Sequence, residues 1–359
     1  MEFWQRVHWF ATSACNQKCR FCFRPRFNHE DSPEVTRRLA EILAENEVRE
    51  VVFTGGEPLL LKSLNTGLEI LHNAGVKTSL HTNATLLTRK RLDCLKELVD
   101  DIAIPLDSTD RETQNYLRNS DCLQKIEEAL EQLQSRKIKI GIHTVATIKN
   151  ISHIPRIYRL LKGRRFDYWR IYEYNPELVT DRFKNVSRFE ETEALRGEMP
   201  TNQDGGVNCL HAKFLLMEER MAQHTDRRIQ FVGISDFDRK PYFFLDTAGN
   251  VYFCKWFLQG KRVDIGNLLK EGFKTIKEKV IRADREGALF DEDAFIDTLG
   301  DTPLWVRAAW EGNYEWEELD EIHQRHYNQF VHLAELHIQR GKWQGYIPRN
   351  AKSMVELVS

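Results

Sequence analysis

Apolar and polar residues alternate with two different periods along the first half of the chain. Short runs rich in β-branched and aromatic residues, bounded by turn residues, predict strands. The segments between them carry apolar residues at helical spacing and predict amphipathic helices. The predicted strands are 7–14, 50–54, 77–82, 101–106, 137–147 and 168–174. The first predicted helix begins at Ser32-Pro33, where serine caps the helix and proline takes its first position. The other predicted helices span 63–74, 88–98, 121–135 and 154–161.

Strands that alternate with helices predict right-handed βαβ units around a parallel sheet. Six such units before about residue 175 predict an α/β fold, a partial (β/α)6 barrel of the TIM type, open or closed. Catalytic residues in such folds lie at the C-terminal ends of the strands. Residues that directly follow the predicted strands are therefore the first candidates for a functional site.

The pattern changes after Pro176. Residues 247–250, Thr-Ala-Gly-Asn, predict a hairpin turn. Short strands are predicted at 230–234, 242–246 and 251–253. We therefore expect three regions: a core barrel over 1–180, a barrel-completing substrate region with the β-hairpin over 181–289, and a helical extension over 290–359 that caps the barrel or contacts a protein partner.

Composition narrows the class of protein. Of the 359 residues, 41% are hydrophobic and 30% are charged, and the formal net charge is -2, which indicates a globular protein without a global preference for nucleic acid or an anionic membrane. No run approaches the roughly 18 uncharged apolar residues of a membrane helix, and residues 1–10 lack the apolar core of a signal peptide. We therefore expect a cytoplasmic protein whose cysteines are metal ligands or reduced thiols. Cys94 and Cys122 fall in predicted helices and are expected to be buried.

Three cysteines form a Cys-x3-Cys-x2-Cys run directly after the first predicted strand: Cys15, Cys19 and Cys22. Three thiolates this close can hold three irons of a [4Fe–4S] cluster and leave the fourth iron without a protein ligand. An open iron can bind a small molecule through nitrogen and oxygen. The alternative is a zinc site with His29 as fourth ligand, but structural zinc sites usually pair their cysteines in two knuckles, and the sequence has no second knuckle.

A second motif, Gly55-Gly56-Glu57-Pro58, directly follows the second predicted strand. Two glycines allow the backbone to approach a ligand closely and to adopt unusual dihedral angles. Alone, the motif is compatible with an ordinary turn between a strand and a helix. Its place one strand–helix unit after the cysteine run makes it far more specific.

The run from Cys15 to Phe23, with Phe21 directly before the third cysteine, resembles the signature of the radical S-adenosylmethionine (SAM) superfamily. The resemblance covers roughly residues 5–175 and implies a radical SAM barrel that holds a [4Fe–4S] cluster and SAM. It implies that an electron from the cluster cleaves SAM to a 5′-deoxyadenosyl radical, which abstracts hydrogen from a bound substrate. It also implies an electron donor such as a flavodoxin or a ferredoxin.

The resemblance also assigns roles to individual residues. Phe21 matches the position that lies against the adenine, and the turn from Gly55 to Pro58 matches the one that binds the methionine amine of SAM, with Glu57 at the acidic position. Further candidates for SAM contacts lie at or near the ends of the third, fourth and fifth strands, and each is equally compatible with loop or barrel packing. They are Thr82, Asn83, Asp107, Ser108, His143 and Thr144. Ala84 stands where relatives often have glycine, so the turn there can differ.

The sequence does not decide the substrate class, which is a peptide, a nucleotide or another small molecule. The segment around the hairpin is weakly similar to SPASM-type peptide-modifying members with auxiliary clusters, but only Cys209 and Cys254 are left there, so we expect no auxiliary cluster. The same segment also resembles viperin-like members, which act on nucleoside triphosphates. A third alternative is a non-catalytic partner protein that keeps the cluster as a structural element, which the intact Gly-Gly-Glu-Pro turn disfavours.

Two further groups bear on the substrate. Basic residues near the predicted barrel mouth either bind phosphate or are solvated surface cations: Arg20, Arg24, Arg26, Arg170 and Lys255. Polar side chains of the sixth strand share one face by the period of two, and either line a cavity or face outward under the C-terminal helices. They are Tyr168, Arg170, Tyr172 and Tyr174, with Glu173 on the opposite face.

Overall fold

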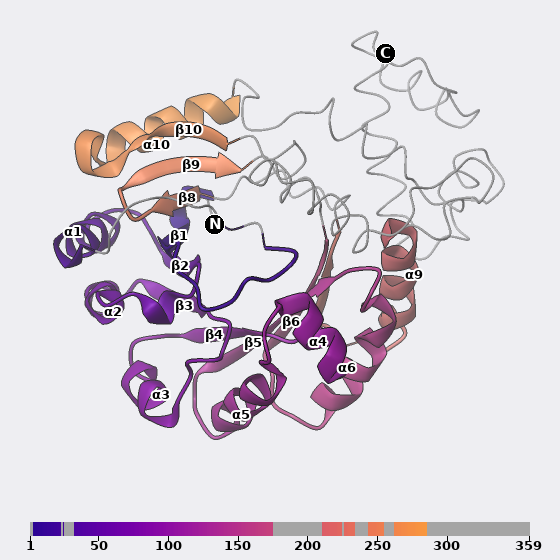
Figure 1. Ribbon diagram of the computed structural model, residues 1–359. Coiled ribbons are helices and arrows are strands. Elements are labelled where there is room, and N and C mark those ends of the chain that lie inside the picture. The colour runs from indigo at the N-terminus through magenta and orange to yellow at the C-terminus, as the bar shows by residue number, and fades with distance from the viewer. Residues whose placement is uncertain are drawn as a thin grey trace, which may run out of the picture.

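The fold is seen in a computed structural model, which describes residues 3–22, 24, 32–174, 210–224, 226–233, 243–254 and 262–285. Figure 1 shows these residues as one curved sheet with helices along its outer side, and the loop after the first strand crosses the space inside the curve. The predicted helical extension over 290–359 lies outside the described residues.

The sheet has ten strands in the order β10-β9-β8-β1-β2-β3-β4-β5-β6-β7. Strands β1 to β7 lie in chain order and every neighbouring pair is parallel. The strands are β1 (Arg6–Thr12), β2 (Glu50–Gly55), β3 (Lys77–His81), β4 (Asp101–Pro105), β5 (Lys139–Ala146), β6 (Tyr168–Glu173), β7 (Ile229–Val232), β8 (Phe243–Asp246), β9 (Asn250–Cys254) and β10 (Arg262–Asn267). Because β10 and β7 are the edge strands, the described sheet is open, and the predicted partial barrel is confirmed.

The predicted hairpin region continues the barrel sheet. β8 pairs parallel with β1, and β9 and β10 follow in antiparallel pairs. All four residues of β8 are buried, from Phe243 to Asp246. A short strand buried on both faces is typical of the interior of a parallel sheet, which explains its place beside β1. The turn at 247–250 joins β8 to β9 as predicted.

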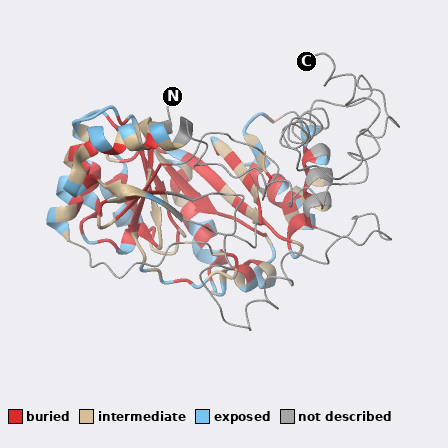
Figure 2. Cartoon of the chain, turned by 90° about the horizontal axis from the view of Figure 1, so that it is seen from above, coloured by how far each residue is buried: buried red, intermediate tan, exposed pale blue. Residues whose placement is uncertain are grey.

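The helices cover the outer face of the sheet, and Figure 2 shows exposed positions on the helices and buried positions along the strands. They are α1 (Pro33–Ala44), α2 (Leu64–Asn73), α3 (Arg89–Leu95), α4 (Arg111–Arg118), α5 (Leu123–Gln134), α6 (Ile154–Lys162), α9 (Leu210–Ala222) and α10 (Leu268–Arg285), with short 3-10 segments η1 (Phe3–Gln5), η2 (Pro58–Leu60) and η3 (Ile151–His153). Side chains of β1 alternate between two environments. Val7 and Trp9 belong to the hydrophobic core under the helices, whereas His8 and Phe10 face the interior of the barrel.

Helix boundaries follow the predicted capping residues. Ser32 accepts a hydrogen bond from the backbone N–H of Val35, and Pro33 occupies the first position of α1. Gly75 follows α2 with a left-handed φ of 73°. These local signals fix where α1 begins and where α2 ends, and so they fix which residues the two helices present to the sheet.

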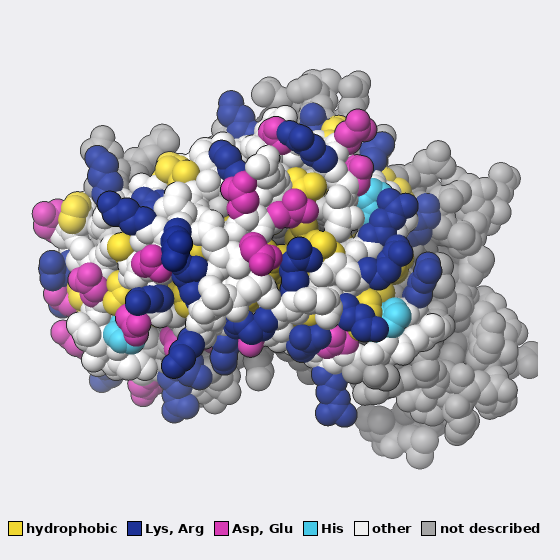
Figure 3. Space-filling model, turned by 90° about the horizontal axis from the view of Figure 1, so that it is seen from below, with side chains coloured by type: hydrophobic (Ala, Val, Ile, Leu, Met, Phe, Trp, Pro, Cys, Tyr) yellow, Lys and Arg dark blue, Asp and Glu magenta, His cyan; other side chains and the backbone are white. Residues whose placement is uncertain are grey.

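The described surface gives little indication of function. Figure 3 shows basic and acidic side chains interspersed over the described part of one face. None of the described helices has the length and apolar character needed to cross a membrane.

Candidate active site

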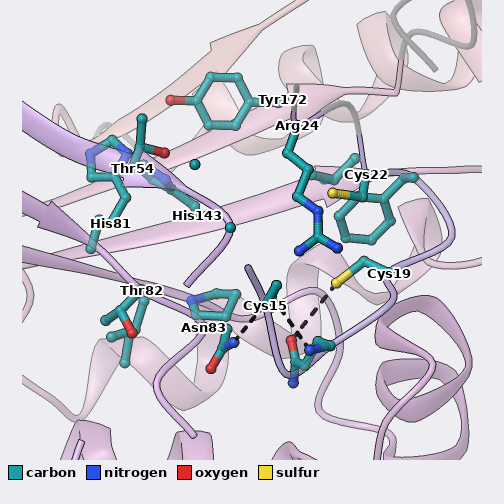
Figure 4. Close-up of a pocket in the computed structure, with 18 of the residues that line it drawn as sticks. Cys15, Cys19, Cys22, Arg24, Thr54, His81, Thr82, Asn83, His143 and Tyr172 are labelled. Atoms are coloured by element: carbon teal, nitrogen blue, oxygen red, sulfur yellow. Dashed lines mark hydrogen bonds between the residues drawn. The ribbon is translucent and has the colours of Figure 1, made fainter. Parts of the chain in front are cut away.

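A cavity opens at the C-terminal ends of the strands and continues into the barrel. It has a volume of about 290 Å³ and is lined from β1 to β6, from β8, from α4 and from the loop after β1. In Figure 4 the cysteines of that loop lie on one side of the cavity, and His81, His143 and Tyr172 lie on another. We call the cysteine side, with residues 12–22, 55–58 and 82–83 and the pair of residues 107 and 118, the rim. The inner polar layer consists of His81, His143, Arg170 and Tyr172.

The cysteines of the motif all face this cavity as free thiols: Cys15, Cys19 and Cys22. Two N–H groups approach Cys15 Sγ, the backbone N–H of Gln17 at 3.4 Å and Asn83 Nδ2 at 3.8 Å. Burial raises the pKa of Cys19 to about 12, against the lowering influence of a nearby arginine. The Cys19 thiol would therefore have to lose its proton in order to bind a metal.

The glycine turn packs directly on the backbone of the cysteine loop. The N–H of Gly56 donates to the carbonyl of Thr12 at 2.7 Å, and the N–H of Glu57 donates to the carbonyl of Ala14 at 2.8 Å. A Cβ on Gly56 would lie 1.9 Å from the Ala14 oxygen, and Gly55 has a φ of 120°. Both glycines also line the cavity. The close contact with the cysteine loop thus explains the two glycines more directly than the approach of a ligand does.

Glu57 of the glycine turn is fully buried, and three donors of the chain bind its carboxylate. Oε1 accepts from Thr82 Oγ1 at 2.6 Å and from the N–H of Leu59 at 3.0 Å, and Oε2 accepts from the N–H of Asn83 at 2.7 Å. Burial raises the pKa of Glu57, while these hydrogen bonds act in the opposite direction. The described cavity lining includes Thr82 and Asn83 but not Glu57. Pro58 follows as the first residue of η2.

Ala84 keeps the backbone conformation that favours glycine. Its φ is 68°, in the left-handed region. Its N–H donates to Thr82 Oγ1 at 3.2 Å. The departure from glycine therefore strains this turn without changing its left-handed form.

An arginine that the sequence analysis did not single out lies beside the cysteines. Arg118 ends α4 and lines the cavity, with Nη1 3.9 Å from Cys19 Sγ. Its guanidinium lies 4.8 Å from the centre of the Phe21 ring, which also lines the cavity. Its Nε donates to the fully buried Asp107 at 2.6 Å. No local spacing marks Arg118, because the fold brings it to Cys19 across 99 positions of the chain.

Several predicted SAM contacts do not face the cavity. Asp107, Ser108 and Thr144 are fully buried, and the described lining does not include them. Ser108 Oγ lies 2.7 Å from His153 Nδ1, and Thr144 Oγ1 donates to the carbonyl of Leu106 at 2.5 Å. These contacts give the three side chains a structural role, and their direct contact with SAM stays a prediction. His143, by contrast, lines the cavity.

The inner polar layer lies on β3, β5 and β6, further into the barrel than the rim. The rings of His81 and His143 meet edge to face with centroids 4.7 Å apart, and His143 meets Tyr172 in the same way at 5.3 Å. Burial lowers the pKa of His81 to about 3 and that of His143 well below its ordinary value. Both imidazoles are therefore neutral at pH 7.

The structure decides the orientation of β6. Arg170, Tyr172 and Tyr174 line the cavity, so the polar face points inward. Tyr168 lies on the same face and donates to Asp101 Oδ1 at 2.7 Å. Glu173, predicted on the opposite face, also reaches the cavity lining at the end of the strand.

The other predicted basic residues have different environments. Arg24 lines the cavity and is labelled among the lining residues in Figure 4. Arg20 lies over the ring of Tyr116 at 4.3 Å and is not part of the described lining. Arg26 and Lys255 lie outside the described residues.

The remaining cysteines also differ in their environments. Cys122 is buried as predicted, but Cys94 is exposed on α3, because the helical face opposite its buried leucines points to solvent. Cys209 and His29 lie outside the described residues, and of Cys254 only the backbone, at the end of β9, is described. The zinc alternative with His29 is thus not tested.

The donor set fits a [4Fe–4S] cluster. Within the described parts of the chain, no group of three or more His, Cys, Asp or Glu side chains converges on a single ion. A cluster differs from a single ion because each thiolate binds a different iron. Three thiols face one cavity here, N–H groups point at Cys15 Sγ, and hydrogen bonds of this kind tune cluster thiolates. The described lining offers three cysteines and no fourth, which would leave one iron of a bound cluster without a protein ligand.

The open parallel sheet and this cysteine-lined cavity define the class of protein. The chain contains a radical SAM domain: the family model of the radical SAM superfamily matches residues 9–161. The family uses a [4Fe–4S] cluster and SAM.

Relatives and solved structures agree with this assignment. A GTP 3′,8-cyclase of Chlorobaculum tepidum is 29% identical over 198 residues, which are 50% of this chain and 58% of the relative. A cysteine-type anaerobic sulfatase-maturating enzyme of Clostridium perfringens is 26% identical over 309 residues, 74% of this chain and 79% of the relative. A solved structure of anSMEcpe with bound AdoMet has a TM-score of 0.58 at 18% identity, covering 94% of this chain and 98% of that chain. This structural likeness concerns the fold.

The first curated relatives are matched over only part of their length. The matched regions are 37%, 58% and 41% of the first three relatives. The domain is thus shared, while the activity of the whole protein is a matter for proposal.

Proposed function

We propose that the chain is a radical SAM enzyme, in which a [4Fe–4S] cluster on Cys15, Cys19 and Cys22 supplies the electron that cleaves SAM to a 5′-deoxyadenosyl radical, and the radical abstracts hydrogen from a bound substrate. One observation carries the proposal: the three cysteines, the glycine turn and Asn83 face one cavity that continues into the barrel. A purely structural cluster needs neither the turn nor the room beyond it. The non-catalytic alternative is therefore disfavoured.

The residues of the rim bind and orient the cofactor in this proposal. Arg118 presents a guanidinium beside Cys19, where a carboxylate such as that of SAM finds a charge-assisted partner. Asp107 holds that guanidinium in place. Phe21 offers a ring against which adenine can lie, and Asn83 offers polar groups to the methionine end.

Glu57 acts here as a positioning residue. Its carboxylate fixes Thr82 and Asn83, which line the cavity. The turn backbone and Asn83 would then hold the methionine amine, with the Glu57 carboxylate supporting Asn83.

Buried apolar side chains keep water from the reacting groups. Phe10, Ile104 and Phe244 line the cavity and are at most 3% exposed. Exclusion of water protects a carbon radical from side reactions. The substrate therefore binds within the barrel, next to the rim.

The test is SAM cleavage by the full chain. We expect anaerobically reconstituted and reduced protein to convert SAM to 5′-deoxyadenosine, measured by liquid chromatography. Cys19→Ala should reduce the product to background, because the cluster loses a ligand. Cys94→Ala, which removes an exposed thiol on α3, should leave it unchanged. A fully loaded cluster that yields no 5′-deoxyadenosine would overturn the proposal and favour the non-catalytic alternative.

The substrate class remains a proposal, a peptide or a small molecule. The relatives named above include one named for GTP and one named for sulfatase maturation. A nucleotide and peptide screen for substrate-dependent 5′-deoxyadenosine separates these classes. A flavodoxin or ferredoxin as electron donor and a cytoplasmic location stay predictions.

A further inference from the structure

The inner polar layer is not explained by SAM cleavage. His81 ends β3, His143 lies on β5, and Arg170 and Tyr172 lie on β6. His143 is in register with Arg170, and His81 is in register with the small Ala103 of β4, which leaves room for the two imidazoles to meet. These side chains line the same cavity as the cysteines, from deeper positions on their strands.

Two nitrogen atoms of this layer lack a hydrogen-bond partner. Nε2 of His81 and Nε2 of His143 are both buried, and neither meets a donor or acceptor among the described residues. Leaving a buried polar atom without a partner is energetically unfavourable. Two such atoms on adjacent rings in one cavity indicate a ligand that the chain does not supply.

The charges around the two rings are positive. After burial, the influences that lower the pKa of His81 are Arg170 and Arg6, and Arg118 adds to them at His143. The cavity lining contains four arginines, Arg6, Arg24, Arg118 and Arg170, against one described carboxylate, Glu173.

The arginines of the lining meet both carboxylate and amide groups. Glu50 pairs with Arg6 at 3.3 Å, and Asp107 pairs with Arg118. Arg170 donates to the neutral amide oxygen of Gln230 at 3.2 Å. A cation would be repelled by this field, whereas an anion is attracted and is offered guanidinium and imidazole N–H donors.

We infer that the inner polar layer binds an anionic group of a small-molecule substrate, a carboxylate or a phosphate, through Arg170, His81 and His143. The inference rests on the proposed function, since it assigns the substrate end of the same cavity. The anionic group anchors deep in the barrel and leaves the remainder of the substrate directed toward the rim. Arginine suits this task because its planar fork pairs with both carboxylates and phosphates.

The experiment measures anion binding to the full chain. Inorganic phosphate and succinate are titrated separately into anaerobically reconstituted protein with SAM, and the heat of binding is recorded. We expect saturable binding of at least one probe, and the probe that binds identifies a phosphate or a carboxylate site. Arg170→Gln and His143→Leu should each weaken it by about tenfold or more. Arg228→Gln is the matched control, since Arg228 also lies over an aromatic ring, Phe166 at 3.8 Å, but outside the described lining.

Two results would overturn the inference: no saturable binding of either probe, or binding that is equally tight in Arg170→Gln, His143→Leu and the control. If one variant fails to retain iron or native circular dichroism, the other decides, with His81→Leu as a third. The electron paramagnetic resonance spectrum of the same samples, with and without SAM, tests the cofactor site independently. A chain that binds the anion but shows no SAM-dependent spectrum contradicts the proposed function and leaves the anion site standing.

Discussion

The rim and the inner polar layer face the same cavity and are built in opposite ways. At the rim, the chain supplies partners for its two buried carboxylates: Glu57 receives three donors, and Asp107 receives Arg118. In the inner layer, His81 and His143 each have a buried nitrogen with no partner in the described chain. Carboxylates that the chain's own hydrogen bonds hold in place pre-organise a site for one cofactor. A site with open donors depends on a substrate to complete it.

Arg118→Gln breaks the rim with the largest expected effect. Asp107 is fully buried and loses its cation, which should reduce the free energy of unfolding by about 3–5 kcal/mol. Arg111→Gln on the same helix removes a guanidinium from a pair with Asp121 whose side chains are 66% and 65% exposed, and should change the free energy of unfolding far less. Urea unfolding of the two variants measures the difference. Equal losses would show that the rim pair is no more important than a surface pair.

The inner layer has a pH signature. His81 has a pKa of about 3 in the folded chain against 6.5 for a free side chain, so between these values the unfolded chain binds the extra proton. Stability therefore falls as the pH falls through this window, by up to about 1.4 kcal/mol per pH unit for this residue. His81→Leu should make the free energy of unfolding decline less steeply over the same window. Parallel profiles for variant and wild type would contradict a neutral His81.

Gly56→Ala tests the contact between the glycine turn and the cysteine loop. The new Cβ would meet the Ala14 oxygen at 1.9 Å, so we expect a loss of about 1–3 kcal/mol together with poorer iron incorporation. At Gly163 a Cβ meets nothing within 4 Å, and Gly163→Ala should change stability by less than about 1 kcal/mol. Thermal unfolding and iron content of both variants decide the matter. Full iron content in Gly56→Ala would separate the turn from the cluster.

Ala84→Gly should have the smallest effect. Relief of the left-handed φ of 68° is offset by the lost methyl group and by the greater freedom of glycine in the unfolded chain. We expect a net change within about 1 kcal/mol and unchanged SAM affinity. A larger loss of either quantity would mean that the methyl group itself shapes the rim.

The rim was largely predictable from sequence, because each of its motifs is local in the chain and directly follows a predicted strand. Cys15, Cys19 and Cys22 are local in sequence, and the glycine turn directly follows a strand whose β-branched run is plain. Parallel strands bring their C-terminal ends to one side of a sheet, so both motifs were expected to meet. The structure adds that the glycines pack on the cysteine loop itself.

The inner polar layer and Arg118 were not predictable in the same way. The period of two placed Arg170 and Tyr172 on one face of β6 but did not say which face points inward. Arg118 reaches Cys19 across 99 positions, a contact set by the packing of α4 and not by any spacing. Such contacts depend on tertiary packing, which leaves no mark on a short sequence window.

The most direct test of the account is the electron paramagnetic resonance spectrum of the reduced, reconstituted chain before and after addition of SAM. If three thiolates leave one iron open at the rim, SAM binds that iron and the g values of the reduced cluster shift. A spectrum that SAM leaves unchanged, or a purified metal content of zinc without iron and sulfide, would contradict the central claim.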